Sequence, residues 1–221
     1  MHISISCINN ITYDWATAQN WPYQLYRNKP ECTITLCIEH PQLLTITHNN
    51  MSLQLGPSGQ FGQWYAQPPL KHSLIQTIRP LLNKQVHIID ATGGMGRDSL
   101  LLAAYLSQQH PVSTLATFEI NPFMASIIEW QTQHIPLNWQ VYKKDFTTLQ
   151  HAEIVIIDPM FPPHPKTAKP QKYTQIIQSL TRDSKGSTEQ DLITHAKSIR
   201  AKHIICKSPP WISSDIWHII K

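Results

Sequence analysis

The sequence has few charged residues and no cysteine pair of the kind that binds metal. Only 14% of its 221 residues are Asp, Glu, Lys or Arg, whereas about a quarter is usual in globular proteins. The four cysteines include no C-x-x-C pair, so neither a metal site nor a disulfide framework is predicted. The net charge of +4 is mild and permits a nucleic-acid partner without requiring one.

Signals for export or membrane insertion are also missing. The residues after Met1 show no basic region followed by an apolar run, so no secretory signal peptide is predicted. No apolar stretch approaches the length that spans a membrane. Hydrophobic residues make up 41% of the chain, which is enough for a buried core. The sequence therefore predicts a soluble, cytoplasmic protein with no membrane partner.

The chain divides by pattern into two parts. Residues 1–65 contain several short runs of alternating apolar and polar residues and predict a small β-rich N-terminal unit. Residues 66–221 predict an α/β domain that begins with a helix at about 69–82. Strands are predicted at 86–90, 114–119, 139–142, 154–158 and 203–206, and helices at 98–108, 122–133, 173–181 and 188–200. This alternation is typical of a Rossmann-like, doubly wound, mostly parallel sheet, which binds ligands at the carboxyl ends of its strands.

A glycine-rich turn follows the first of these strands. Gly93, Gly94 and Gly96 lie between a strand that ends at Asp90 and a helix, which is the context of a nucleotide-binding turn. Glycine permits positive φ and close approach of a ligand. Asp98 places a carboxylate in the first helical turn, where it would repel a pyrophosphate. The same carboxylate suits the sulfonium and amino group of S-adenosylmethionine, so Asp90, Gly93 and Gly94 are candidate contacts of that cofactor.

Acidic residues at the next two strand ends fit the same ligand. Glu119 ends the second strand and is expected to accept ribose hydroxyls. Asp145 follows the third strand and could accept a hydrogen bond from an adenine amino group. The alternative is that the glycines only make a tight connection and that Asp98 caps its helix. Polar groups at three strand ends, in register with one ligand, favour the cofactor site.

A second cluster, Asp158-Pro159-Met160-Phe161-Pro162, follows the fourth strand. Exocyclic amines of nucleobases are poor nucleophiles because the ring delocalises the nitrogen lone pair. The Asp158 carboxylate and the Pro159 carbonyl are candidates to accept the two N–H groups, and Phe161 to stack on the base, a contact worth roughly 1–3 kcal/mol. The alternative is a proline-rich loop capped by a buried aromatic residue. The nearby glycine turn favours methyl transfer to a base nitrogen.

Basic residues lie close to this cluster. Lys166, Lys169 and Lys172 follow it in a proline-rich loop, and Lys207 follows the fifth strand. They are candidate contacts to RNA phosphates around the target base, with a solvated basic loop as the alternative. The histidines show no ligand spacing, and we interpret them as surface or core residues.

The segments Asp90–Asp98 and Asp158–Pro162 resemble the ribosomal RNA small subunit methyltransferase J family. That family methylates N2 of a guanine in 16S rRNA and uses S-adenosylmethionine, and the likeness spans about residues 43–209. It implies S-adenosylmethionine as cofactor and 16S rRNA or the small ribosomal subunit as partner. The cofactor contacts that it implies are Arg97, Asp98, Glu119, Ile120, Lys144, Asp145 and Asp158.

The chain departs from the family pattern in three places. Lys144-Asp145 stands where the family has a pair of small residues. The run Gly59–Trp64 lacks the arginine of a glycine- and arginine-rich run in the family. The family also has a closing strand after the fifth strand, and none is predicted here before Lys221.

Two other functions fit the sequence. One is an amino-methyltransferase acting on adenine or cytosine of DNA, because the Asp158 cluster suits any exocyclic amine. The other is a non-catalytic RNA-binding protein that retains the fold; the Lys144-Asp145 pair and the missing closing strand motivate this alternative.

Overall fold

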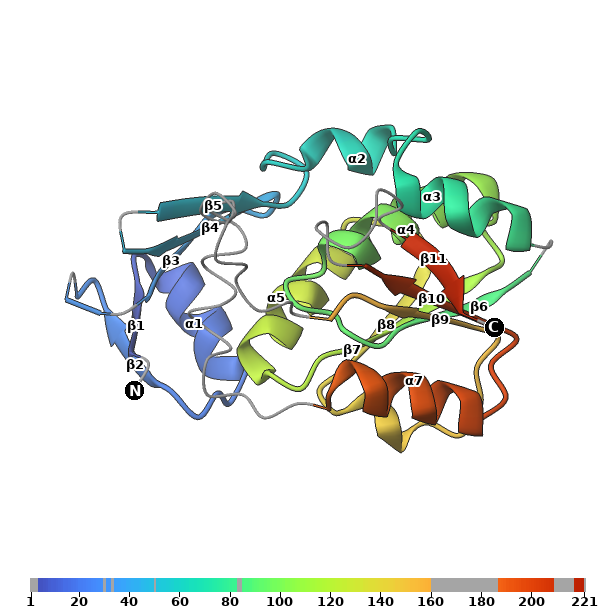
Figure 1. Cartoon of the computed structure of the whole chain (residues 1–221). Coiled ribbons are helices and arrows are strands. Elements are labelled where there is room, and N and C mark those ends of the chain that lie inside the picture. Colours follow the sequence, from blue (N-terminus) through green and yellow to red (C-terminus); the bar gives the residue numbers. More distant parts are fainter. Residues whose placement is uncertain are drawn as a thin grey trace, which may run out of the picture. The chain divides into compact units, whose positions relative to one another are not determined.

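The computed structural model of the chain describes residues 4–29, 31–32, 34–49, 51–82, 85–159, 187–208 and 217–220. Contacts between Cα atoms divide these residues into two units, one up to Gln63 and one from Trp64 onward. Each unit has a β-sheet of its own (Figure 1). In the described part of the chain, no helix is both long and apolar enough to cross a membrane.

The first unit contains a five-stranded sheet with the strand order β2-β1-β3-β4-β5. Its elements are β1 (Ser4–Cys7), α1 (Asn10–Ala18), β2 (Gln24–Arg27), β3 (Ile34–His40), β4 (Leu43–His48) and β5 (Met51–Leu55). Strand β1 runs parallel to both of its neighbours, whereas β3, β4 and β5 form an antiparallel meander. Alternate residues of β3, among them Ile34 and Leu36, are fully buried, as the predicted alternation requires.

Helix α1 was not predicted from the sequence, which indicated a mostly β unit. Only Thr12 and Ala16 of this helix are buried, so its apolar periodicity is weak. The helix is fixed by polar contacts instead. The Asn9 side chain caps it by accepting from the Thr12 N–H at 2.8 Å and donates to the Ile38 carbonyl at 3.0 Å. The Thr12 hydroxyl in turn accepts from the Ile38 N–H at 2.7 Å.

The second unit contains a six-stranded sheet with the strand order β11-β10-β9-β6-β7-β8. Its strands are β6 (His87–Asp90), β7 (Thr114–Phe118), β8 (Asn138–Tyr142), β9 (Ile154–Ile157), β10 (His203–Lys207) and β11 (Trp217–Ile220). Helix α2 (Gly62–Ala66) lies at the junction of the units, and the other helices are α3 (Ser73–Ile78), α4 (Arg97–Gln109), α5 (Pro122–Thr132) and α7 (Glu189–Ser198), with 3₁₀ turns η1 (Arg79–Leu81) and η2 (Phe146–Thr148). Strands β6 to β10 are all parallel.

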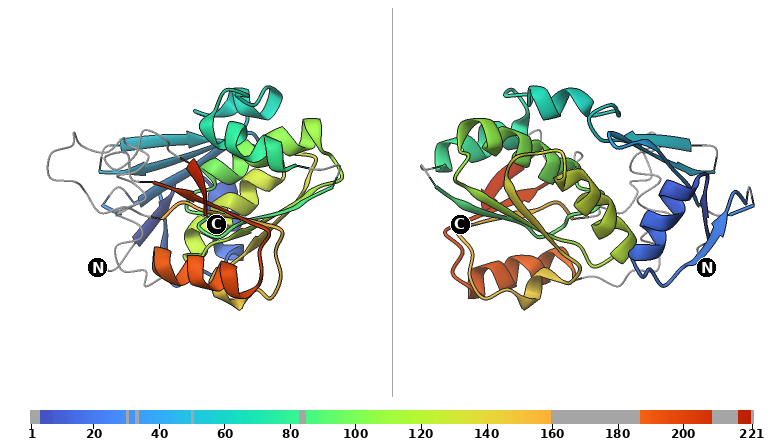
Figure 2. Two further views of the ribbon diagram at one scale, coloured as in Figure 1. Left: turned by 45° about the vertical axis from the view of Figure 1, so that its right-hand side comes forward. Right: turned by 180° about the vertical axis from the view of Figure 1, so that it is seen from behind.

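Helices cover both faces of this sheet. Helices α3, α4 and α5 lie over one face and α7 over the other (Figures 1 and 2). All four residues of β9 are buried, as expected of a central parallel strand covered on both sides. The strand order reverses between β6 and β9, which makes that position the topological switch point. This arrangement confirms the predicted Rossmann-like fold.

Two local predictions require correction. The predicted helix at 69–82 is shorter, because α3 ends at Ile78 and the chain continues as the 3₁₀ turn around Pro80, which lacks the N–H for an α-helix. The predicted absence of a closing strand is wrong, because β11 pairs antiparallel with β10, with Trp217 opposite Lys207. With four residues, two of them exposed, this edge strand is too short for a clear periodic signal. The predicted helix at 173–181 lies outside the described residues.

Candidate active site

The glycines of the turn after β6 differ in the room around them. Gly94 and Gly96 adopt φ values of +55° and +81°, which L side chains rarely adopt. A Cβ atom at Gly93 would lie 2.7 Å from Thr117 Cγ2, so this position requires glycine. Among the described residues, a Cβ atom at Gly94 would meet just the Thr92 carbonyl, at an ordinary contact distance of 3.9 Å. The turn therefore packs tightly at Gly93 and, with respect to the described residues, has room at Gly94, as the approach of a nucleoside cofactor requires.

Glu119, directly after β7, is joined to this turn. Its Oε2 accepts from the Gly94 N–H at 2.7 Å, and its Oε1 accepts from the Asn121 N–H at 2.7 Å. Burial raises the pKa of Glu119 to about 7, against the hydrogen bonds, which lower it. Each carboxylate oxygen can accept a second hydrogen bond. The residue therefore both fixes the turn and retains acceptor capacity for a ribose hydroxyl.

Asp90 lies beneath the turn and is bound by protein groups. Its Oδ1 accepts from the Thr92 N–H at 3.0 Å, and its Oδ2 accepts from the Ser99 hydroxyl at 2.5 Å. The Ser99 hydroxyl also lies 2.7 Å from the Thr117 hydroxyl, which accepts from the Trp139 indole N–H at 2.9 Å. Burial raises the pKa of Asp90 to about 6. The network braces the turn against α4 and the neighbouring strands.

Asp158 stands at the end of β9, next to the glycine turn. Its backbone N–H donates to the Thr92 hydroxyl at 2.7 Å. Because β9 and β6 are adjacent parallel strands, this bond joins the two segments that the sequence singled out. The predicted meeting of the glycine turn and the Asp158 cluster therefore occurs at the switch point, as far as the cluster is described.

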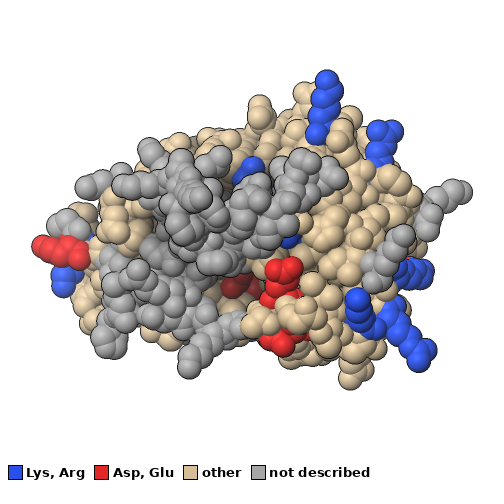
Figure 3. Space-filling view, viewed as in Figure 1, with Lys and Arg blue, Asp and Glu red and all other residues tan. Residues whose placement is uncertain are grey.

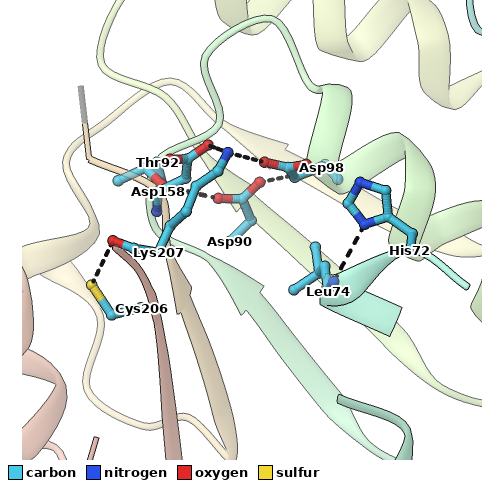
Figure 4. A network of polar contacts seen from close by, with 9 residues as sticks. His72, Leu74, Asp90, Thr92, Asp98, Asp158, Cys206 and Lys207 are labelled. Atoms are coloured by element: carbon cyan, nitrogen blue, oxygen red, sulfur yellow. Dashed lines mark hydrogen bonds and ion pairs between the residues drawn. The ribbon is translucent and has the colours of Figure 1, made fainter. Parts of the chain in front are cut away.

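The Asp158 carboxylate belongs to a compact charged group with Asp98 and Lys207 (Figure 4). Lys207 Nζ lies 2.5 Å from Asp158 Oδ2 and 3.5 Å from Asp98 Oδ2. Burial and the Asp98 carboxylate raise the pKa of Asp158, and Lys207 opposes them. Burial lowers the pKa of Lys207, but the two carboxylates outweigh it and leave that pKa raised. Lys207 was predicted as a phosphate contact on the rim; the structure instead places its ammonium between two carboxylates.

The carboxylate after the third strand accepts hydrogen bonds from protein groups. Asp145 Oδ1 accepts from the Thr147 N–H at 2.8 Å, and Oδ2 accepts from the Ser187 hydroxyl at 2.8 Å. Burial raises the pKa of Asp145, but these hydrogen bonds outweigh it and leave the pKa lowered. Lys144 Nζ lies 5.3 Å from the centre of the Tyr142 ring. The side chain of Ile120 is 42% exposed and offers an apolar surface.

Several predicted residues cannot be placed in this site. Phe161, Lys166 and Lys169 lie outside the described residues. Pro159 is described and half-buried.

On the face drawn in Figure 3, acidic side chains gather near the middle, and the Lys and Arg side chains stand mainly toward the right-hand edge. Among the described residues, no group of three His, Cys, Asp or Glu side chains could hold a metal ion.

Three residues near the site were not singled out by the sequence. Thr92 joins the two segments, Trp217 of β11 has its ring centre 5.1 Å from Lys207 Nζ, and His72 precedes α3. The His72 Nδ1 accepts from the Leu74 N–H at 3.3 Å (Figure 4). Burial lowers the pKa of His72. His72 lies inside the helix predicted at 69–82, so no sequence signal marked it as the residue that caps α3.

Comparison with protein families finds a match over most of the second unit. Residues 70–214 match the family described as "Putative SAM-dependent methyltransferase", where SAM is S-adenosylmethionine. The chain is also similar to the ribosomal RNA small subunit methyltransferase J of Haemophilus ducreyi, with 29% identity over 139 residues. That alignment covers 56% of this chain and 52% of the relative. The protein of the same name from Pseudoalteromonas translucida is 28% identical, with the same two coverages.

The chain thus spans about half the length of these curated relatives. Among solved structures it is similar to a SAM-dependent methyltransferase from Neisseria gonorrhoeae, with a TM-score of 0.62 and 20% identity. That likeness covers 93% of this chain and 84% of the other and supports the fold. The resemblance inferred from the two sequence segments is confirmed by the curated relatives.

Proposed function

This chain belongs to the SAM-dependent methyltransferase family, and we propose that it methylates the exocyclic N2 amino group of a guanine in small-subunit (16S) rRNA. The observation that carries the proposal is the bond between the Asp158 N–H and the Thr92 hydroxyl. It holds the amine-accepting carboxylate beside the glycine turn, which has room at Gly94 among the described residues. A methyl donor and a target nitrogen bound at these two places would meet at the switch point.

The residues present suit S-adenosylmethionine. The space above Gly94 admits the nucleoside, and the Glu119 carboxylate has acceptor capacity for its ribose. The carboxylate of Asp98, about one-seventh exposed, lies in the first turn of α4 and suits a cationic ligand. Gly93, Arg97 and Ile120 complete the proposed contacts around these groups. When bound, the cofactor supplies an electrophilic methyl group on a sulfonium.

Asp158 prepares the target amine for attack. Its carboxylate accepts one N–H of the amine, and the Pro159 carbonyl accepts the other, so that the nitrogen lone pair turns out of conjugation. The nitrogen forms its bond to the methyl carbon as the carbon–sulfur bond breaks, and it then releases one proton to water. Orientation supplies most of the effect, so Asp158 need not be a strong base.

The proposed target follows from two supports. The curated relatives carry the name ribosomal RNA small subunit methyltransferase J. The Asp158 cluster, with Phe161 as the proposed stacking residue, suits a base extruded from its helix, which requires a few kcal/mol. Lys166 and Lys169 are proposed to contact the flanking phosphates.

Transfer of a labelled methyl group tests this proposal. Purified protein is incubated with labelled S-adenosylmethionine and with 16S rRNA, assembled small subunits, DNA or total protein, each taken from cells that lack this gene. We expect label in rRNA or subunits, and digestion of that RNA to yield N2-methylguanine. Label confined to DNA would favour an adenine or cytosine methyltransferase. Cofactor binding with no transfer to any substrate would favour a non-catalytic RNA-binding protein.

A further inference from the structure

Three side chains lie close to the Lys207 ammonium at the end of β10. Its ammonium lies 2.5 Å from Asp158 Oδ2 and 3.5 Å from Asp98 Oδ2 (Figure 4). The ring centre of Trp217 lies 5.1 Å from Nζ, within the range of a cation–π contact. Trp217 is the residue opposite Lys207 in the β10–β11 pair and is itself buried. Strand β11 therefore contributes one of the three side chains that contact Lys207.

Two carboxylates close together and partly shielded from water cannot both stay ionised without a compensating cation. The Asp158 and Asp98 side chains are only 27% and 14% exposed. Lys207 is in direct contact with both, and one cation between two anions leaves the group with a net charge of −1. If Lys207 were absent, the pair would tend to retain a proton.

The protonation state of Asp158 matters for amine activation. An ionised carboxylate only accepts hydrogen bonds, whereas a protonated carboxyl also donates one. A donor at this position would oppose the N–H groups of the target amine. An oxygen that accepts from Lys207 keeps a second lone pair, so the lysine can be bound while the carboxylate still accepts from substrate.

We propose that Lys207, backed by Trp217, is a positioning residue that keeps Asp158 ionised and correctly oriented for the target amine. This role rests on the proposed function. It differs from a phosphate contact, because the ammonium faces inward to the carboxylates. It also gives β11 a function, which is to hold the lysine over the site.

Other titratable groups face the same cluster. Asp98 and Arg97 come from the start of α4, Asp90 lies beneath the turn, His72 precedes α3, and Cys206 precedes the lysine on β10. These groups are unchanged by a substitution at Lys207. A shift in the titration of Asp158 on such a substitution therefore reports the contribution of the lysine charge.

The first experiment measures the rate of methyl transfer against pH under single-turnover conditions. For Lys207→Gln we expect the acidic limb of the profile to move up by about one pH unit or more, with activity recovering at high pH. Lys207→Arg keeps the charge and should leave the limb near its wild-type position. Trp217→Leu should move the limb in the same direction as Lys207→Gln but by less.

Lys202→Gln is the matched control. Lys202 also pairs with a carboxylate, that of Glu153 at 2.7 Å, but it precedes β10 and its side chain is 65% exposed. This variant should show the wild-type profile. A Lys207→Gln variant that is slower by the same factor at every pH would overturn the proposal, because that is the result of a purely structural role. So would a Lys207→Arg variant no better than Lys207→Gln.

The second experiment needs no substrate. The carboxyl ¹³C resonance of Asp158, assigned by its loss in Asp158→Asn, is titrated in the wild type and in Lys207→Gln. We expect a higher midpoint in the variant; equal midpoints would overturn the role of Lys207. A wild type inactive on every nucleic acid would overturn the proposed function, while this titration would still decide the role of the lysine.

Discussion

The hydroxyl of Thr92 accepts the backbone N–H of Asp158 at 2.7 Å and lies 3.4 Å from Asp90 Oδ1, to which it donates. One side chain therefore couples the turn after β6 to the loop after β9. Directly after β6, the Ala91 N–H also donates to the Ile156 carbonyl of β9 at 2.9 Å, and the Thr92 hydroxyl extends this connection to Asp158. The relative position of the two halves of the site depends on this coupling.

Replacing Thr92 with Val should separate the two loops, because Val keeps the shape and removes the hydroxyl. The bond is part-buried, and a fully buried N–H that loses its acceptor costs about 1–3 kcal/mol. We expect the free energy of unfolding, measured in urea, to fall by up to that amount and methyl transfer to fall with it. Thr92→Ser retains the hydroxyl and should stay close to wild type in both measurements. Val and Ser variants that behave alike would show that the bond is unimportant.

Replacing Asp158 with Ala should abolish methyl transfer while leaving most of the fold intact. The side chain is partly exposed at a strand end, and the rate should fall about 100-fold or more because a preorganised hydrogen-bond acceptor is lost. Circular dichroism checks the fold, and calorimetry checks cofactor binding. Glu153→Ala, which removes an ion-paired carboxylate just before β9, is the control and should remain active. Unchanged turnover in Asp158→Ala would refute the assigned role.

Alanine at Gly94 and at Gly96 should have different effects. Both residues have positive φ, so each alanine should destabilise the fold, by about 1 kcal/mol from the backbone alone. At Gly96 the new Cβ would also lie 3.0 Å from Ile128 Cγ1, which adds strain within the core. At Gly94 it would have room with respect to the described residues, at the place that we propose for the cofactor. We expect Gly94→Ala to weaken cofactor binding more in calorimetry, and Gly96→Ala to lower the melting temperature more.

Asp90 should make stability depend on pH in a definite direction. Burial raises its pKa from an ordinary 3.8 to about 6, so the folded state binds the proton more tightly than the unfolded state does. The resulting stabilisation is complete below pH 3.8 and is lost as the pH rises through about 6. Asp90→Asn retains the shape and does not titrate. Relative to that variant, wild type should lose about 2 kcal/mol of unfolding free energy between pH 4 and 7. A difference that is constant with pH would contradict the assignment.

The large-scale fold of the second unit could be predicted because its signals are local and repeated. The glycine turn, the apolar strand 154–157 and the helix that starts at Pro122 each carry a clear pattern. The two elements that were not predicted, α1 and β11, have weak apolar patterns. Helix α1 buries only Thr12 and Ala16, and strand β11 has four residues with two exposed, so contacts with distant segments decide both structures.

The candidate site, like the fold, could be predicted only in part. Residues that end strands were found, because parallel strands bring their carboxyl ends to one edge of the sheet. Residues that contact others across the sheet were not. Trp217 lies 59 positions after Asp158 in the sequence. It reaches the site because β10 pairs with β11, which places Trp217 opposite Lys207. The role first given to Lys207 was inferred from its charge and from its place after the fifth strand.

The sequence by itself determined the sheet, the glycine turn and the acid that follows β9, because the period of apolar residues and the special backbone freedom of glycine act locally. Tertiary structure alone decided which charges meet. Asp98, Asp158 and Lys207 lie far apart in the chain and come together only when α4, β9 and β10 are packed. Electrostatic interactions fall off with distance and depend on burial, and both quantities exist only in the folded protein.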